Sequence, residues 1–353
     1  MSIGEIVLLV LIGQLVGAEG FTQIELYLKH HESVIRKFLP LENGIPSHDT
    51  MERVIALIKP NVMAELQRKW LHLQAAGETD KIKKLINIDG KTIRGNRNKH
   101  QNPLHIVSAY SDSDGLFLGQ LPTEEKSNEI TAIPKLIAQL DLKNTIITIN
   151  AIGTQKKIAA TILENKADYC LAVKENHQYL YEDIKDYLCD EQFQEQLKQN
   201  NRYFRTIEKA RGQVEMREYF VTTDVQWLNE RNPGWEGLKA IGMATNTIER
   251  DDQVTVENRY FILSLDVSVK EFAKCVRGHW KIESMHWLLD VVFREDATHI
   301  LHKNAAQNLN ILRKLALGVL KAMTFDRSRL SYKNKIFSFG LKPERYLRQL
   351  LEM

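Results

Sequence analysis

The sequence predicts an α/β fold in which helices cover both faces of a mixed β-sheet, preceded by an all-helical domain. Three observations support this prediction. Apolar residues recur at helical three-to-four spacing within residues 5–76. From residue 85 onward, short apolar runs alternate with longer amphipathic segments, a pattern typical of strands alternating with helices. Between about residues 200 and 265, β-type runs separated by turn signals interrupt that alternation.

The bulk composition is that of an ordinary globular protein, and 353 residues can form two or three structural units. The 48 basic and 45 acidic residues give a net charge of +3, which excludes a polycation but permits local basic patches that contact phosphate. Three scattered cysteines lack the spacing of a zinc site and fit a reducing cytoplasm. The apolar run of residues 6–16 is too short to cross a membrane. We therefore predict a cytoplasmic protein without a membrane partner.

The front of the chain is expected to be helical. Two helical blocks, residues 5–40 and about 51–76, flank a turn in which Ser47 or Asp49 can cap the second block. We assign residues 1–80 to this N-terminal helical domain.

The alternating segment that follows predicts the sheet. Strands are expected to end at Asp89 and to cover residues 105–110, 116–120, 145–150 and 169–173, with helices at 128–140 and 155–164. Three antiparallel strands followed by alternating α and β units form the ribonuclease H-like order of elements.

A second set of strands is expected within the same domain. They cover residues 202–209, 215–222, 237–245 and 255–263, ahead of helices at 269–291, 304–323 and 343–352. A block of strands between an α/β half and a later helix is diagnostic of a subset of nucleases. We therefore assign residues 81–353 to one ribonuclease H-like domain with a β insertion at about 200–265.

Three polar residues indicate a candidate metal site. Asp89 and Asn150 each end an expected strand, and Glu283 lies on an amphipathic helix. Carboxylates in this arrangement could hold two Mg²⁺ ions about 3.5–4 Å apart, which would stabilise both reacting oxygens in phosphodiester cleavage. Taken singly, the three are better explained as a turn former, a turn or helix cap and an exposed helix acid. Only the combination indicates a site, and one of its members is an amide.

Basic residues follow the expected strand ends. Lys91, Arg94 and Arg97 lie shortly after Asp89, so their loop could hold phosphates of a DNA backbone. A solvated surface loop is the alternative. Lys174 follows another expected strand, and its assignment to DNA rests on analogy alone.

The helix that carries Glu283 has further candidates. His279 lies one turn before Glu283 on the same face, where it could contact the scissile phosphate or orient the carboxylate. A purely structural histidine is the alternative. Arg277 and Lys281 flank the same turn and are candidate phosphate contacts.

Several longer motifs carry a family resemblance. They are Ile88-Asp89-Gly-Lys-Thr-Ile-Arg94-Gly, His105-Ile-Val-Ser-Ala-Tyr, Glu125-Lys-Ser-Asn-Glu-Ile-Thr-Ala-Ile-Pro134, Arg277-Gly-His-Trp-Lys-Ile-Glu283, Leu289-Asp-Val-Val-Phe-Arg-Glu-Asp296 and Asn304-Ala-Ala-Gln-Asn-Leu. In this order, over nearly the whole chain, they resemble the DDE transposases of the ISAs-type insertion sequences, which include the H-repeat-associated proteins. The N-terminal block resembles the family's associated domain. Because family members usually start a few tens of residues earlier, this copy is expected to be shortened at its front.

The resemblance implies three metal-binding acids on a ribonuclease H-like domain. The first falls on Asp89 and the last on Glu283. The second falls on Asn150, where the family motif usually has aspartate in Thr-Ile-Asp-Ala-Met-Gly. Because an amide offers one neutral oxygen, we expect weaker Mg²⁺ binding and catalysis reduced by orders of magnitude.

The implied function is a DNA transposase that hydrolyses phosphodiester bonds and transfers strands at insertion-sequence ends. The resemblance implies two Mg²⁺ or Mn²⁺ ions in an active member, double-stranded terminal-repeat and target DNA as partners, and a homo-oligomer on DNA. A catalytically inactive remnant that still binds DNA is the alternative. A site-specific endonuclease without strand transfer is a third possibility. The sequence separates the first two only through Asn150 and the short N-terminus.

Overall fold

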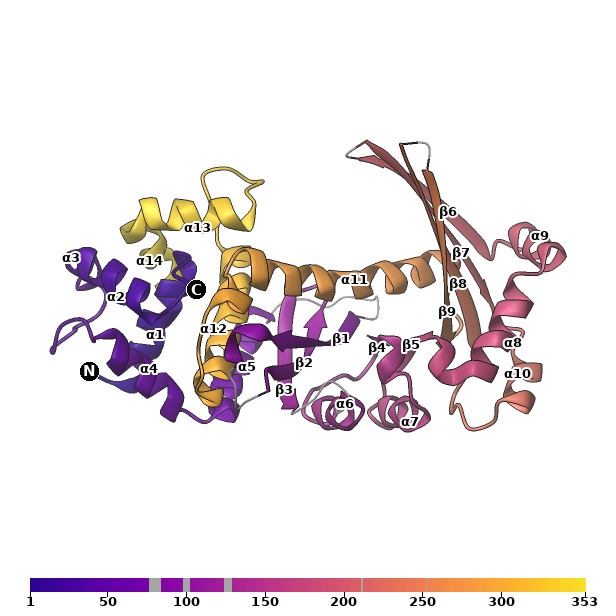
Figure 1. The fold of residues 1–353 in the computed structure, drawn as a ribbon, viewed down its shortest axis with the longest axis horizontal. Helices are drawn as coiled ribbons and strands as arrows, with labels where there is room; N and C mark the ends of the chain where they lie inside the picture. Colours follow the sequence, from indigo (N-terminus) through magenta and orange to yellow (C-terminus); the bar gives the residue numbers. More distant parts are fainter. Residues whose placement is uncertain (76–83, 98–101, 124–128, 211, 252) are drawn as a thin grey trace.

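The computed structural model describes residues 1–75, 84–97, 102–123, 129–210, 212–251 and 253–353 (Figure 1). The expected domain boundary at residues 80 and 81 and the first four residues of the motif that begins at Glu125 lie outside this part of the chain.

One mixed sheet runs through the middle of the molecule. Over the described residues it has nine strands in the order β3-β2-β1-β4-β5-β9-β8-β7-β6. Its first half comprises β1 (Lys84–Ile93), β2 (Leu104–Ser111), β3 (Leu116–Thr123), β4 (Thr145–Ile149) and β5 (Asp168–Val173). The first three strands are antiparallel neighbours, whereas β4 is parallel to both β1 and β5. This is the predicted ribonuclease H-like arrangement.

The inserted strands continue this sheet instead of forming a separate one. They are β6 (Tyr203–Ala210), β7 (Gln213–Thr222), β8 (Ala240–Arg250) and β9 (Gln253–Leu263). Each pairs antiparallel with the next, and the last four residues of β9 pair with β5. The outer halves of these strands therefore project beyond the body of the molecule (Figure 1).

Helices cover both faces of the sheet, as predicted. The long α11 (Val269–Val291) crosses one face and contacts β1, β4 and the inserted strands. The opposite face carries α6 (Glu129–Ile137), α7 (Lys156–Glu164) and α8 (Gln178–Leu188) (Figure 1). The sequence did not predict α8, nor the two shorter helices α9 (Glu191–Gln199) and α10 (Gln226–Arg231), which lie at the same end.

Alternation along β1 decides which residues face α11. Ile86 and Ile88 are buried in the core shared with α6 and α7. Asn87 points the other way and donates a hydrogen bond from Nδ2 to the carbonyl of Gly278 on α11, over 2.9 Å. Because side chains alternate along a strand, Asp89 also lies on the α11 side.

A helical body closes the other end of the sheet. It contains α1 (Ile3–Leu15), α2 (Phe21–His30), α3 (Glu32–Ile35), α4 (His48–Leu57), α5 (Pro60–Ala75), α12 (Lys303–Ala322), α13 (Tyr332–Leu341) and α14 (Pro343–Leu351). Helix α12 is buried along most of its length and contacts α1, α4, α5 and β3. Ser47 caps α4 by accepting a hydrogen bond from the Thr50 amide, as predicted. One core therefore joins N- and C-terminal helices, and the division into domains near residue 80 stays a prediction.

Among the helices of the described residues, none is both long and apolar enough to cross a bilayer.

Candidate active site

Asp89 and Asn150 meet at neighbouring parallel strands. In the register of β1 and β4, Ile88 lies opposite Ile149. The residues that follow them, Asp89 and Asn150, therefore lie side by side at the end of this pairing. The amide Nδ2 of Asn150 donates a hydrogen bond to Oδ1 of Asp89 over 2.9 Å. The two strand positions predicted to lie together are therefore in direct contact.

Asp89 does not end its strand, contrary to the sequence prediction. Strand β1 continues to Ile93 because residues 90–93 pair with β2. Only the pairing with β4 stops, at Ile88. The Asp-Gly pair that suggested a turn is thus part of β1, at the point where this strand pairs with β2 alone. Because β4 no longer pairs there, the Asp89 side chain has room beside Asn150.

The second polar atom of Asn150 is engaged as well. Its Oδ1 accepts a hydrogen bond from the backbone amide of Gly153 over 3.2 Å and so caps the short helix η3 (Ala151–Gly153). The amide oxygen, which is the atom of this side chain able to bind a hard cation, is therefore turned toward the backbone. This is the helix-cap interpretation that the sequence left open.

Glu283 lies on α11 and is exposed. Desolvation by its surroundings and the negative charge of Asp89 raise the pKa of its carboxyl, and the charges of Arg259 and Lys174 partly oppose this. The charge of Asp89 thus acts on the Glu283 carboxyl, which is consistent with both side chains lying on the α11 side of the sheet.

His286 contacts Asp89, and the sequence analysis had not assigned it a role. Its Nδ1 lies 3.4 Å from Oδ2 of Asp89, a long contact, and its ring stacks on Phe117 with centroids 6.3 Å apart. Among the described residues, its buried Nε2 has no hydrogen-bond partner. The available signal was spacing: His286 lies three residues after Glu283, and thus on the same face of α11.

The electrostatics of this pair depend on burial. Burial raises the pKa of the Asp89 carboxyl, but the hydrogen bond and charge of His286, together with the charge of His279, outweigh it and leave the pKa lowered. Burial also lowers the pKa of His286 itself, despite the opposing effect of Asp89. The two shifts disagree about the charge on His286. The 3.4 Å separation of Nδ1 and Oδ2 is that of an electrostatic contact between the two groups.

His279 is held against the strands by a hydrogen-bonded chain. Its Nδ1 lies 2.9 Å from Oγ1 of Thr148, which donates its only proton to Oδ1 of Asn87 over 2.7 Å. The Thr148 hydroxyl must therefore accept from His279, so Nδ1 carries the proton and Nε2 is free to accept. Burial lowers the pKa of His279. These contacts fix the ring against the strands, whereas its predicted roles, contact with the scissile phosphate or orientation of Glu283, remain predictions.

Lys91 lies within an acidic cluster instead of on the surface. Its side chain is 9% exposed, and Nζ lies 2.7 Å from Asp290, 3.0 Å from Glu295 and 3.4 Å from Asp296. Burial raises the pKa of Glu295, but Lys91 and Arg313 outweigh that effect and hold it at about 2. Three carboxylates thus surround the ammonium, and this placement does not favour the predicted contact of Lys91 with phosphate.

The other predicted DNA contacts lie on the surface. Arg94 has a side chain that is 82% exposed, with Asp296 3.7 Å from its Nε, and Arg97 and Lys174 are also exposed. These side chains can reach a ligand without breaking a buried contact.

Two further predicted contacts are engaged in ion pairs. Arg277 pairs with Glu208 of β6 over 2.9 Å, and both side chains are exposed. Lys281 is itself exposed but pairs over 2.7 Å with Asp112, which is partly buried. An exposed pair contributes little to stability, so Arg277 can exchange its carboxylate for a phosphate.

The donor set does not fit two metal ions. No group of three or more His, Cys, Asp or Glu side chains arranged to hold a metal occurs in the described part of the chain. Asp89 and Glu283 offer carboxylates, but the oxygen of Asn150 is bound to Gly153 and its nitrogen faces Asp89. A bridging carboxylate between two ions is therefore missing at this position.

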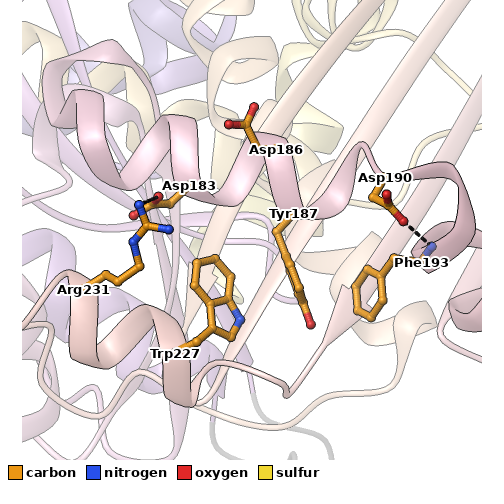
Figure 2. A pocket seen from close by; sticks show the side chains of 7 residues that line it. All are labelled: Asp183, Asp186, Tyr187, Asp190, Phe193, Trp227 and Arg231. Carbon is orange, nitrogen blue, oxygen red and sulfur yellow. Dashed lines mark hydrogen bonds and ion pairs between the residues drawn. The ribbon is translucent and has the colours of Figure 1, made fainter.

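A separate pocket lies between α8, α9 and α10 (Figure 2). It has a volume of about 470 Å³ and is lined by Asp183, Asp186, Tyr187, Asp190, Phe193, Trp227 and Arg231. Tyr187 contacts both other rings, at centroid distances of 4.4 and 4.7 Å. None of the predicted site residues lines this pocket, and its acidic side chains would repel a phosphate backbone.

Comparisons with known proteins agree with the motifs. Residues 80–319 match the family described as transposase DDE domain, and residues 2–71 match the one described as DDE_Tnp_1-associated. YncI of Escherichia coli O157:H7, named as a transposase, is 37% identical over 331 residues, which cover 91% of this chain and 82% of YncI. YhhI of Escherichia coli strain K12, named as an H repeat-associated transposase, is 33% identical over 350 residues, which cover 97% of this chain and 88% of YhhI.

Solved structures were matched as well. A piggyBac transposase in a synaptic complex with hairpin DNA gives a TM-score of 0.39 at 12% identity, covering 99% of this chain and 72% of that one. The family assignment rests on the sequence matches, which extend over most of the chain and include the segments that carry Asp89, Asn150 and Glu283. The chain belongs to the DDE transposase family.

Proposed function

We propose that this DNA transposase holds a divalent cation, Mg²⁺ or Mn²⁺, between Asp89 and Glu283, and that Asn150 leaves its DNA cleavage greatly reduced. The observation that carries the proposal is the hydrogen bond from Asn150 to Asp89. It occupies a carboxylate oxygen that a metal ion would otherwise use, and it does so without any cation.

The difference between an amide and a carboxylate at position 150 is electrostatic. Two carboxylates about 3 Å apart repel each other by roughly 5 kcal/mol at an effective dielectric constant of about 20. A divalent cation relieves that repulsion, so an aspartate at position 150 would strengthen metal binding. With asparagine, the same two side chains attract each other, and this contribution to metal affinity is absent.

The proposed reaction is phosphodiester hydrolysis followed by strand transfer at insertion-sequence ends. A bound metal would supply charge stabilisation to the reacting oxygens. The chain's own contribution would be to bind DNA through exposed cations, namely Arg94, Arg97, Lys174, Arg277 and Lys281. We propose double-stranded DNA as the partner, a homo-oligomer on DNA as the assembly and the cytoplasm as the location. Lys91 is not among the cations proposed to bind DNA, because three carboxylates surround its ammonium group.

A second candidate function is a DNA-binding protein that no longer cuts. The contacts of Asn150 favour it, since both of its polar side-chain atoms are satisfied without metal. In this state the basic surface would still hold DNA. The two candidates differ in whether any cleavage remains.

Cleavage of the DNA that flanks the reading frame tests the proposal. We expect Asn150→Asp to cut the inverted repeats orders of magnitude faster than the parent chain in Mn²⁺ or Mg²⁺, with similar DNA affinity. Asn150→Asp combined with Glu283→Gln is the matched control and should again be inactive. Equal rates for the parent and Asn150→Asp would show that the amide does not limit catalysis, whereas no measurable cutting by the parent would favour the binding protein.

A further inference from the structure

The outer half of β9 forms an open edge of the sheet. Strand β9 pairs with β5 only through residues 260–263, whereas its pairing with β8 continues out to Gln253. All six residues from 253 to 258 are exposed. Within the described residues this segment has a strand neighbour on one side only, so its other side presents backbone N–H and C=O groups to solvent.

The two free edges of the inserted strands differ in how they are protected. Strand β6, at the far edge, carries Arg205, Glu208 and Lys209, all exposed, and charged side chains of this kind discourage pairing with another strand. The open part of β9 begins Gln-Val-Thr-Val, without charge or proline. Its valines, Val254 and Val256, are each 62% exposed.

The geometry of β9 is also suited to pairing. Its register with β8 runs without interruption from Gln253 to Leu263, so no bulge twists the edge away. Val254 and Val256 lie on one face, the face that farther along contains the buried Tyr260. Thr255 lies on the opposite face, together with Arg259, whose guanidinium stacks over Trp280 of α11 at 4.8 Å.

We infer that residues 253–257 pair antiparallel with the same residues of a second copy of this chain, about a two-fold axis at Thr255. A two-fold axis perpendicular to the sheet keeps each residue on its own face. Because opposed residues in a sheet share a face, the axis must pass through a residue and not between two. An axis at Thr255 places Val254 opposite Val256 of the second copy, which is a favourable β-branched pair.

The charges in this segment favour a protein over DNA. Residues 253–258 contain one acid, Glu257, and no basic residue, so they offer nothing to a phosphate backbone. With the axis at Thr255, Glu257 lies opposite the neutral Gln253 of the second copy, and no like charges are opposed. An axis at Val256 would instead set Val254 opposite Asn258 and leave one valine pair, Val256 with its own copy, in place of two.

The predicted dimer is weak in free solution. Five residues of edge pairing in each chain bury far less than the roughly 800 Å² per partner of a standard interface. A covalent cross-link between the two copies therefore reports the dimer better than a measurement of particle size in solution. The pairing does not depend on DNA cleavage, so it would stand even if the proposed catalysis were disproved. The cleavage assay tests the proposed function, and a separate cross-linking experiment tests the pairing.

Disulfide cross-linking of the full chain tests the pairing. Thr255→Cys is made in a Cys189→Ser background, because Cys189 is the exposed native cysteine while Cys170 and Cys275 are buried. Opposed residues of an antiparallel pair have Cα atoms about 4.5–5.5 Å apart, within the range that a disulfide spans. The matched control is Ile207→Cys, which is 54% exposed on the protected edge, β6.

We expect the Thr255→Cys chain to form covalent dimers several-fold faster than the Ile207→Cys chain under the same mild oxidant. Adding Val254→Lys and Val256→Lys should abolish that excess, whereas adding Ile207→Lys should not, and circular dichroism melting should verify that each variant is folded. The inference is overturned if the two cysteines cross-link equally, if neither does, or if the paired lysines have no effect while Ile207→Lys does.

Discussion

The amide nitrogen of Asn150 lies 2.9 Å from Oδ1 of Asp89 and donates a hydrogen bond to it, at the position where the family resemblance places a second carboxylate. A carboxylate could not make this bond. At this position the chain therefore has a hydrogen bond between two of its own side chains where the resemblance implies a second acidic ligand.

The stability of the chain should respond much more strongly to metal when position 150 is acidic than when it is asparagine. In EDTA, Asn150→Asp should be less stable than the parent by roughly 1–3 kcal/mol, because it leaves two carboxylates facing each other without a partner. Mn²⁺ should restore that loss, while the parent changes little. Thermal melting with and without Mn²⁺ measures both. Asn150→Ala is the control, since it loses the bond but should not regain stability with Mn²⁺. Equal stabilisation of the parent by Mn²⁺ would contradict the prediction.

Lys91 and Arg94 should separate stability from DNA binding. Lys91→Gln removes the cation from a buried acidic cluster and should cost roughly 3–5 kcal/mol of unfolding free energy. Arg94→Gln, on an 82% exposed side chain, should leave stability within about 0.5 kcal/mol. It should reduce the slope of log DNA affinity against log salt by about 1. Urea unfolding and salt titrations of DNA binding give the two readouts. If Lys91→Gln instead lowered the salt dependence of DNA binding without loss of stability, the result would support the predicted contact between Lys91 and a DNA phosphate.

His286 is expected to act as a positioning residue for Asp89. In the Asn150→Asp background, His286→Phe keeps an aromatic ring beside Phe117 but removes the Nδ1 donor, and it should weaken Mn²⁺ binding about 10- to 100-fold. His286→Asn retains a donor near the same place and should recover most of the affinity. Calorimetric titration measures the binding, and melting in EDTA reports any general loss of structure. A uniform loss in both variants, matching their loss of stability, would assign His286 to packing alone.

Lys314 should make stability depend on pH above neutrality. Burial lowers the pKa of its amine to about 7, although Glu295 opposes the shift, and Nζ contacts Ser108 and Gln120 at 2.7 and 2.6 Å. Above pH 7 the unfolded chain therefore binds a proton at this site that the folded chain does not. Stability should rise with pH, with a slope that approaches about 1.4 kcal/mol per pH unit.

Urea unfolding between pH 7.5 and 9 checks this dependence. The difference in slope between the parent and Lys314→Met isolates this amine from other titrating groups, because methionine fills a similar volume without a proton. A parallel pH dependence in both chains would mean that Lys314 remains charged in the folded state.

Local patterns were sufficient to predict most of the elements. The predicted apolar runs lie within β1, β4 and β5, although β1 extends beyond its run, and the amphipathic segment predicted as residues 269–291 is the observed α11. The adjacency of Asp89 and Asn150 could also be anticipated, since parallel neighbours in an α/β sheet present their carboxyl ends at one edge. Family membership followed from motifs that are contiguous in the chain and were confirmed by the sequence matches.

The sequence by itself therefore determined the elements, their order and the family of the protein. The tertiary structure decided that β9 joins β5, that His286 contacts Asp89, and that Lys91 is buried against Glu295. Each of these contacts joins residues about 90 to 200 positions apart, where no periodicity or capping signal links the partners. Whether a lysine contacts DNA or a carboxylate, and whether an amide oxygen faces a metal or a backbone N–H, depends on which distant groups folding brings within hydrogen-bond distance.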